Sequence, residues 1–327
     1  MVFSNPVFSS AAAKVQNGQT PFIASASEAP TGLDLYSRFA FAGACCCSIT
    51  HGGVTPIDVV KTRMQLRPDE FSGGMISGFR KVIAEEGAMA LWTGVGPTAA
   101  GYFLQGAFKF GGYEFFKKQF VDSWGMEKAK ENRTFIYLAS AGCAEFFADV
   151  ALCPLEATRI RMVSQPDYGT GLASVAGRLL KEEGLITGFY SGFIPILLKQ
   201  VPYTMAKFVV FERLSEAIYG YLPPKEELSN VTVTCVNLGG GVGAGVVSAI
   251  ISQPADTMLS KVNKGGDTSG SIMSRLAAVA AKEGVSGLFA GTGARCVMVG
   301  TITAGQFAIY GDIKRVLNAS GGTEIGK

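Results

Sequence analysis

The stretch Thr55-Pro56-Ile57-Asp58-Val59-Val60-Lys61-Thr62-Arg63 occurs three times in this chain in related form. It returns as Cys153-Pro154-Leu155-Glu156-Ala157-Thr158-Arg159-Ile160-Arg161 and, altered, as Gln253-Pro254-Ala255-Asp256-Thr257-Met258-Leu259-Ser260-Lys261. Each copy has a proline, an acid two residues later and a base seven residues later. The copies lie about 100 residues apart, and self-similarity at a fixed period is the signature of a repeat architecture. The chain is therefore expected to contain three repeats.

The composition indicates an integral membrane protein. Charged residues make up 17% of the chain, against about 25% in soluble domains. There are 42 glycines, and glycine is more frequent in transmembrane helices than in soluble ones. The net charge of +3 is too small to indicate a nucleic-acid partner. We expect an all-α membrane protein in which the three repeats form one domain.

Each repeat contains two long apolar stretches. Residues 39–57 include no acid, lysine or arginine, and about 20 such residues span a bilayer as a helix. Pro56 is expected to kink its helix and not to end it, because the pattern resumes beyond the proline. The long helices are expected at residues 35–65, 92–120, 135–165, 190–219, 228–255 and 294–317.

A short amphipathic stretch that ends in Glu-Gly separates the two long stretches of each repeat, as in residues 75–86. It is too charged to span a membrane and is expected to lie at its surface. Three parallel repeats predict a pseudo-threefold axis along the membrane normal, with the substrate site where the repeats face one another. The predicted repeats are residues 32–125, 126–225 and 226–318, between a flexible segment at 1–31 and a tail at 319–327.

Ionisable residues lie inside the predicted spanning helices. Each costs about 2.5–3.5 kcal/mol on insertion scales and tends to face a bundle interior or an aqueous cavity. Extension of the side chain toward the membrane surface would explain charges at helix ends, but not those of Lys109, Lys199, Lys207 and Glu145. Several cations with neutral hydrogen-bonding groups suit a small, strongly hydrated anion. The predicted substrate-binding residues are Gln105, Lys109, Lys199, Gln200, Tyr203, Lys207, Arg295 and Met298.

The three proline motifs supply three acids, Asp58, Glu156 and Asp256, but only two bases five residues after the proline, Lys61 and Arg159. Leu259 takes the third position. Acid and base could pair within one helix or between neighbouring helices, and in either case one carboxylate lacks a partner. Such a carboxylate is a candidate proton carrier. The predicted proton-coupling residues are His51, Glu145, Asp149 and Glu156, and the last three share one helix face.

Two other features are expected to be structural. Cys45, Cys46 and Cys47 lack the CxxC spacing of a metal or redox site. We expect them to be small core residues of a protein in a reducing compartment. The glycine-rich run at 239–245 lies inside an apolar stretch with no Lys-Ser/Thr after it, which favours close helix packing over a phosphate-binding loop. Neither a metal ion nor a cofactor is expected.

The repeated pattern P-x-[DE]-x-x-[KR]-x-[KR] resembles that of the mitochondrial carrier family, over about residues 35–315. The stretches at 101–111, 199–208, 253–256 and 298–303 are similar to members of that family that carry phosphate, the fungal ones in particular. The resemblance implies import of phosphate across the mitochondrial inner membrane with a proton, or in exchange for hydroxide, by alternating access. It also implies phosphate, protons and the bilayer as partners, with cardiolipin on the matrix side, and a functional monomer.

The resemblance also implies two gates. In the matrix gate, Asp58 pairs with Arg159 and Asp256 with Lys61, which leaves Glu156 opposite Leu259. The cytoplasmic gate consists of Glu114, Lys117 and Glu212. This second gate is expected to be weak, because Ser215 and Gly311 stand where the family has a base and an acid.

Two alternatives remain open from the sequence. The same fold could carry another small anion, such as a dicarboxylate or a nucleotide, or a copper-bearing anion. A membrane redox protein or enzyme would have to use His51 and the cysteines. One histidine in the whole chain, without a nucleophile-base-acid arrangement, favours a transporter.

Overall fold

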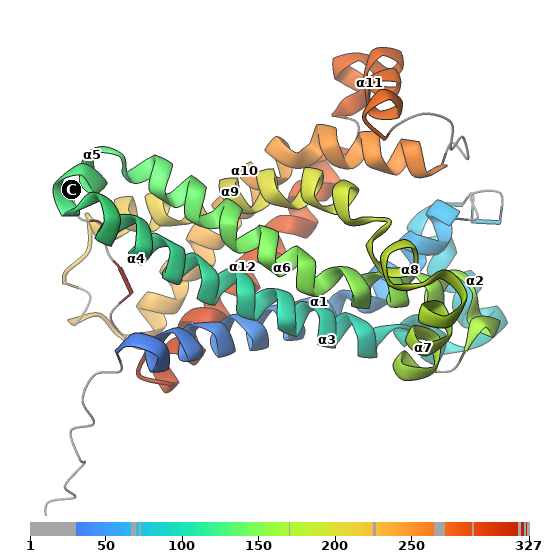
Figure 1. Cartoon of the computed structure of the whole chain (residues 1–327), viewed down its shortest axis with the longest axis horizontal. Coiled ribbons are helices and arrows are strands. Elements are labelled where there is room, and N and C mark those ends of the chain that lie inside the picture. The colour runs from blue at the N-terminus through green and yellow to red at the C-terminus, as the bar shows by residue number, and fades with distance from the viewer. Residues whose placement is uncertain are drawn as a thin grey trace, which may run out of the picture.

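The computed structural model describes residues 31–66, 70–71, 73–169, 171–224, 227–264, 272–289, 291–319, 322–323 and 325 (Figure 1). The segment expected to be flexible, residues 1–31, lies outside this range except for residue 31. Within the described residues six long helical runs dominate. They are α1 (Gly32–Leu66), the continuous run of α3 (Val95–Gly106), η4 (Ala107–Gly111) and α4 (Gly112–Trp124), α6 (Arg133–Ser164), α9 (Phe193–Tyr219), α10 (Asn230–Lys264) and α12 (Thr292–Val316).

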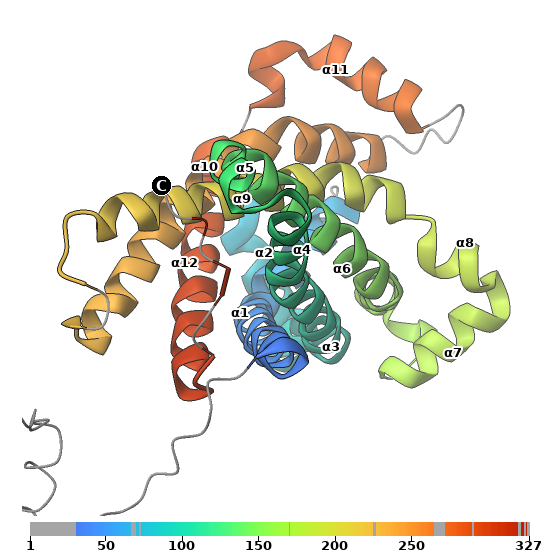
Figure 2. The ribbon, with the colours of Figure 1, turned by 60° about the vertical axis from the view of Figure 1, so that its left-hand side comes forward.

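Each long run packs against the next one along the chain, and α12 packs back against α1, so the six runs close into a ring (Figure 2). The short helices α2 (Gly74–Glu86), α7 (Leu172–Glu183) and α11 (Ile272–Leu288) all lie toward one end of that ring, on the right in Figure 1. Minor turns of helix, namely η3 (Ala88–Trp92), α5 (Met126–Glu131), η5 (Pro166–Tyr168) and α8 (Leu185–Tyr190), connect the elements. The predicted arrangement of two long helices and one short helix in each repeat is confirmed.

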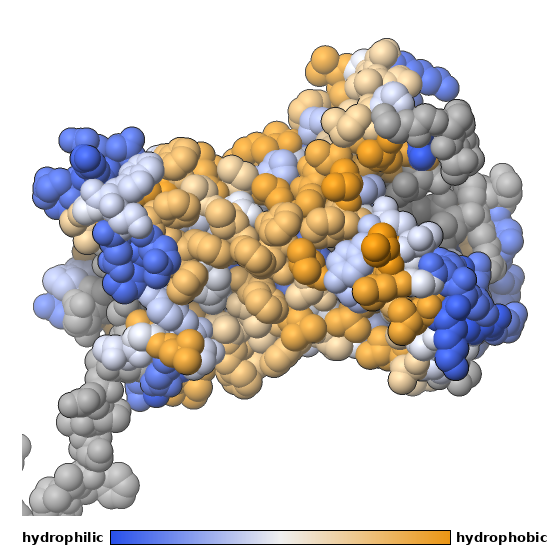
Figure 3. All heavy atoms as spheres, in the orientation of Figure 1, coloured by the Kyte–Doolittle hydropathy of each residue, from blue (hydrophilic) through white to orange (hydrophobic). Residues whose placement is uncertain are grey.

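On the face shown in Figure 3, apolar residues form a band across the middle of the molecule, with hydrophilic residues gathered at both ends. Large apolar side chains such as Phe41, Phe147 and Ile250 are exposed, as expected where lipid replaces water. Among the described residues, four helices are long and apolar enough to cross a membrane: Arg133–Ser164, Leu185–Tyr219, Asn230–Leu259 and Arg295–Val316. The π-helical turn η4 lies within the run from α3 to α4.

The motif prolines lie inside helices that continue beyond them. Pro56 lies within α1, Pro154 within α6 and Pro254 within α10. The neighbouring α9 also contains an internal proline, Pro202. The prediction that Pro56 does not end its helix is confirmed, whereas α10 continues to Lys264, beyond the end expected at residue 255.

The short helices are held to the long ones by the last base of each motif. Each of these bases forms an ion pair with the glutamate of the following Glu-Gly: Arg63 with Glu86, Arg161 with Glu183, and Lys261 with Glu283. The glycines after these glutamates have φ values of +85°, +80° and +63°. This left-handed conformation is one that glycine adopts without a steric penalty, so the Glu-Gly pair fixes where the chain turns back.

Close packing explains the glycine run in α10. A Cβ atom added to Gly241 or Gly245 would lie 2.7 Å from the Cα atom of Ala304 or Gly300, respectively, on α12. The backbones of α10 and α12 therefore approach too closely for any side chain at these positions. This agrees with the predicted packing role.

The C-terminal residues return to the first half of the chain. Ile325 is buried among Val121, Ile136 and Tyr137, and the Arg133 guanidinium donates to its carbonyl oxygen at 3.3 Å. The sequence contained no signal for this contact, because the apolar residue stands alone in a polar tail.

Candidate functional site

The first cluster of charges lies at the proline motifs. The Arg159 guanidinium lies 2.8 Å from the Glu156 carboxylate on its own helix, and 3.5 Å from that of Asp58 on α1. Arg159 thus forms ion pairs with two acids, and the pair with Asp58 joins α6 to α1. The contact with Asp58 is the one that the resemblance implies, whereas Glu156 was expected to have no basic partner.

Asp256 differs from the expectation. Its carboxylate lies 2.7 Å from the Arg295 guanidinium on α12 and 3.8 Å from the Lys199 ammonium on α9. No described residue forms an ion pair with Lys61, the partner that the resemblance implies. Arg295 is fixed in this position because it also donates to the Ser252 hydroxyl at 2.8 Å. Lys199 and Arg295, predicted to bind substrate, therefore belong to the motif cluster.

The second cluster lies deeper, between the α3–α4 run and α6. The Lys109 ammonium lies 3.0 Å from a carboxylate oxygen of Glu145. The Gln105 amide nitrogen donates to the other oxygen of Glu145 at 3.1 Å and to Asp149 at 3.3 Å. All four side chains are buried. The second carboxylate oxygen of Asp149 is buried and has no hydrogen-bond partner in the described part of the chain.

His51 on α1 stacks on Tyr102 of α3, with ring centroids 3.6 Å apart and ring planes 3° from parallel. The stacking fixes the orientation of the imidazole beside the second cluster. The structure shows no hydrogen bond between the described residues and the His51 ring. Four residues were predicted to couple proton transfer. Among them, hydrogen bonds link only Glu145 and Asp149, which both accept from the Gln105 amide.

A third group of polar side chains joins α9 to α12. The Lys207 ammonium donates to the Gln306 amide oxygen at 3.2 Å, and the Tyr203 and Thr303 hydroxyl groups lie 3.2 Å apart. Gln306 was missing from the predicted site. Gln200 and Met298, which were predicted, are half-buried and make no hydrogen bond to the site among the described residues.

The fourth cluster lies at the opposite end of the helices. The Lys117 ammonium lies 3.1 Å from Glu114 and 3.3 Å from Glu212, and the Tyr113 hydroxyl donates to Glu212 at 3.3 Å. The contacts with Glu212 join α4 to α9. The side chain of Lys117 is only 4% exposed, whereas that of Asp256 in the motif cluster is 29% exposed. Glu212 of the same cluster is 30% exposed and Arg159 of the motif cluster is 8% exposed, so each cluster contains a buried cation and a partly exposed acid.

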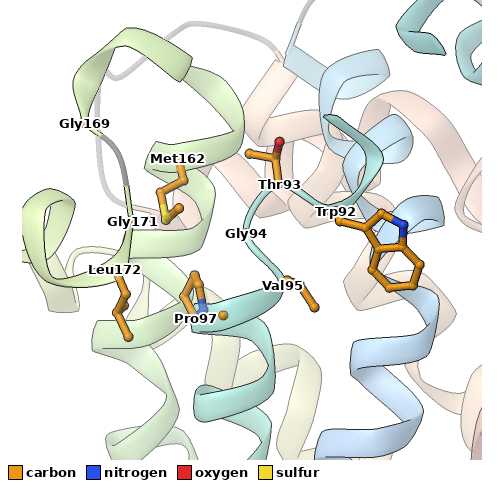
Figure 4. A pocket seen from close by; sticks show the side chains of 10 residues that line it. Trp92, Thr93, Gly94, Val95, Pro97, Met162, Gly169, Gly171 and Leu172 are labelled. Atoms are coloured by element: carbon orange, nitrogen blue, oxygen red, sulfur yellow. The ribbon is translucent and has the colours of Figure 1, made fainter. Parts of the chain in front are cut away.

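A pocket of about 420 Å³ lies apart from these clusters, where α3 and α7 begin (Figure 4). Trp92, Gly94, Pro97, Met162 and Leu172 are among the residues that line it. No residue of the charged clusters contributes to its wall. The pocket is thus no part of the interior site.

Comparison with known proteins agrees with this architecture. The sequence pattern of the family described as Mitochondrial carrier protein matches residues 35–124, 130–222 and 232–321. A Dictyostelium discoideum protein, "Mitochondrial substrate carrier family protein N", is 50% identical over 287 residues, covering 86% of this chain and 95% of the relative.

Two further relatives come from a nematode and a yeast. The Caenorhabditis elegans "Phosphate carrier protein, mitochondrial" is 43% identical, covering 90% of this chain and 86% of the relative. The Schizosaccharomyces pombe "Probable mitochondrial phosphate carrier protein" is 41% identical, covering 85% of this chain and 90% of the relative. The chain therefore belongs to the mitochondrial carrier family, whose members are transporters and not enzymes, and is a multi-pass protein of the mitochondrial inner membrane.

Proposed function

We propose that this protein imports inorganic phosphate into the mitochondrial matrix together with a proton, or equivalently in exchange for hydroxide. The observation that carries the proposal is the buried Lys207. Lys207 is 1% exposed, and no carboxylate of the described residues lies within 4.0 Å of its ammonium group. Burying a cation without a counter-ion costs free energy. An anionic substrate that binds beside Lys207 would supply the missing counter-ion.

The chemistry of the interior supports a small oxyanion. Lysine presents a compact, strongly hydrated charge, whereas arginine is suited to planar, bidentate recognition. Lys109 and Lys207 are the cations of the deep interior, and Arg295 is engaged by Asp256 near one end. The names of the nematode and yeast relatives both refer to phosphate.

Proton coupling is assigned to Glu145 and Asp149, with His51 beside them. The two carboxylates share one donor, Gln105, and only Glu145 has a cation, Lys109, within 4.0 Å among the described residues. A second negative charge in a buried site that holds one cation is costly. A proton taken up there can therefore accompany an anion that binds to Lys207.

Alternating access requires that one end of the passage opens while the other closes. The motif cluster and the Lys117 cluster lie at opposite ends of the helix ring, and each contains ion pairs between helices. We assign them as the matrix gate and the cytoplasmic gate. The buried Lys117 joins α4 to α9 through its ion pair with Glu212, which supports assigning this structure to a state closed to the cytoplasm.

The pocket where α3 and α7 begin is assigned to lipid. It lies on the outside of the ring at the motif end, and apolar side chains such as Pro97 and Leu172 line it. The first amide groups of a helix favour an anionic group. These features suit a phospholipid such as cardiolipin, and the closed ring of one chain suits a functional monomer.

Uptake of labelled phosphate into liposomes that contain the purified protein tests this proposal. Uptake should be saturable, and excess unlabelled phosphate should abolish it, whereas the same excess of malate or ADP should not. Competition by malate or ADP as strong as that by phosphate would assign the fold to another cargo. Empty liposomes and heat-denatured protein provide the baseline.

A further inference from the structure

At one equivalent position of the three repeats, the third repeat carries a different residue from the first two. The sequence Lys109-Phe110-x-x-Tyr113-Glu114 returns as Lys207-Phe208-x-x-Phe211-Glu212 and as Gln306-Phe307-x-x-Tyr310-Gly311. Equivalent positions in three repeats lie at one depth around a common axis. Two repeats therefore place a lysine at this depth, and the third places an amide.

The phenylalanines that follow these residues mark the axis. The ring centroids of Phe110, Phe208 and Phe307 lie 5.2, 5.9 and 6.0 Å apart in the three pairs. Each of the three rings meets the other two at a steep angle. The three repeats thus meet at this phenylalanine triad, one residue after each of the three polar residues.

Lys207 lies close to the axis itself. Its ammonium nitrogen is 5.5 Å from the ring centroids of Phe110 and Phe208 and 5.8 Å from that of Phe307. Nearly equal distances from three rings around an axis place the charge near that axis. An anion that travels from the motif end to the phenylalanine triad therefore meets this ammonium group.

Gln306 is the hydrogen-bond partner of Lys207. An ammonium group is only a donor, so the amide must present its oxygen to Lys207, at 3.2 Å. The amide nitrogen of Gln306 then offers two N–H groups that have no acceptor within the described residues. They lie beside the ammonium group, where an oxygen of a bound anion would be.

We propose that Gln306 is a substrate-binding residue, which positions Lys207 on the axis with its amide oxygen and donates from its amide nitrogen to the bound oxyanion. This inference rests on the proposed function and names a residue that determines specificity. Lys109 is paired with Glu145, and within the described residues Lys207 is the deep lysine that has no carboxylate within 4.0 Å. The neutral amide of Gln306 adds no further positive charge beside it, which suits a singly charged, protonated phosphate.

Two substitutions test the two parts of the proposal. Gln306→Leu keeps the volume but removes the donor, and the loss of a hydrogen bond to a charged ligand should raise the KM for phosphate about tenfold or more. Gln306→Lys adds the base that the other repeats carry, so doubly charged sulfate should inhibit phosphate uptake at a concentration at least about tenfold lower than for the wild type.

Thr204→Val is the matched control. Thr204 is buried on α9 and its hydroxyl has no hydrogen-bond partner in the described chain, so its KM and sulfate inhibition should match the wild type. Thermal unfolding in detergent establishes which variants fold. If Gln306→Leu does not fold, Gln306→Asn replaces it and should raise KM as well, because its shorter amide cannot reach both groups.

The outcomes separate the two proposals. If folded Gln306→Leu or Gln306→Asn keeps the wild-type KM, or if sulfate inhibits Gln306→Lys no better than the wild type, the assignment of Gln306 is wrong while phosphate transport stands. If the wild-type protein takes up no phosphate, the proposed function fails first. The ratio of sulfate to phosphate affinity is a readout that a purely structural role would leave unchanged.

Discussion

The ammonium group of Lys109 lies 3.0 Å from the carboxylate of Glu145, and both side chains are almost completely buried. Lys109 lies in the π-helical turn η4 and Glu145 on α6, so the ion pair joins the first repeat to the second. Breaking a buried pair by removing one partner costs about 3–5 kcal/mol, because the other charge is left uncompensated. The pair therefore contributes to stability as well as to transport.

A double-mutant cycle tests this dependence. Lys109→Gln and Glu145→Gln should each lower the thermal unfolding temperature in detergent, since each leaves one buried charge. The double variant should be more stable than the sum of the two effects predicts. Additive losses in the unfolding temperature would show that the two side chains are not coupled.

The Lys117 cluster should contribute to stability far more than a neighbouring surface pair. Lys117→Gln leaves the buried Glu114 and the partly exposed Glu212 without their cation, and should lower the unfolding temperature by several degrees. Lys118→Gln is the control, because the Lys118–Asp122 pair is about half exposed on both sides, and exposed pairs contribute about 0–1 kcal/mol. Equal shifts for the two variants would contradict the assignment of the cluster as a closed gate.

Gly106 should tolerate no side chain. A Cβ atom there would overlap the carbonyl oxygen of Gly43 on α1 and lie 2.8 Å from the Cβ atom of Cys47. Gly106→Ala should therefore separate α1 from α3 and reduce the yield of folded protein. Gly177 on α7 has nothing within 4 Å of an added Cβ atom, so Gly177→Ala should be neutral or stabilise by up to about 1 kcal/mol. A normal yield of Gly106→Ala would refute this close approach.

A base at position 259 should destabilise the protein and not complete the matrix gate. Leu259 is 7% exposed and packs with Val262 and Leu276, so Leu259→Lys buries a charge among apolar side chains. Its unfolding temperature should fall, while Leu259→Met, which conserves volume, should remain close to the wild type. If Leu259→Lys unfolds at the wild-type temperature, the lysine has reached the carboxylates of the gate.

The architecture could be predicted from the sequence because its signals are local. Runs of about 20 uncharged residues, a proline motif at a fixed period and the Glu-Gly pairs each depend on neighbouring residues. Together they located the ends of the long helices to within a few residues, except for α10, which continues to Lys264 and not to residue 255 as expected. The π-helical turn at 107–111 was not predicted, because neither its composition nor its spacing differs from that of the helix around it.

The partners in the site could be predicted only in part. Lys109, Lys207 and Glu145 were found because a charge inside an apolar run is conspicuous. The partners of Asp256 are Lys199 and Arg295, which lie on two other helices, and no spacing along one helix reports such contacts. A comparison of equivalent positions in the three repeats would have identified Gln306, because the other two positions carry lysine.

Phosphate uptake at a fixed external pH, with and without an inwardly directed proton gradient, tests the central claim most directly. In liposomes that contain the wild-type protein, the gradient should accelerate uptake and drive phosphate above its external concentration. Collapse of the gradient with a protonophore should abolish both effects. Uptake that proceeds at the same rate and to the same level without the gradient would contradict proton-coupled transport.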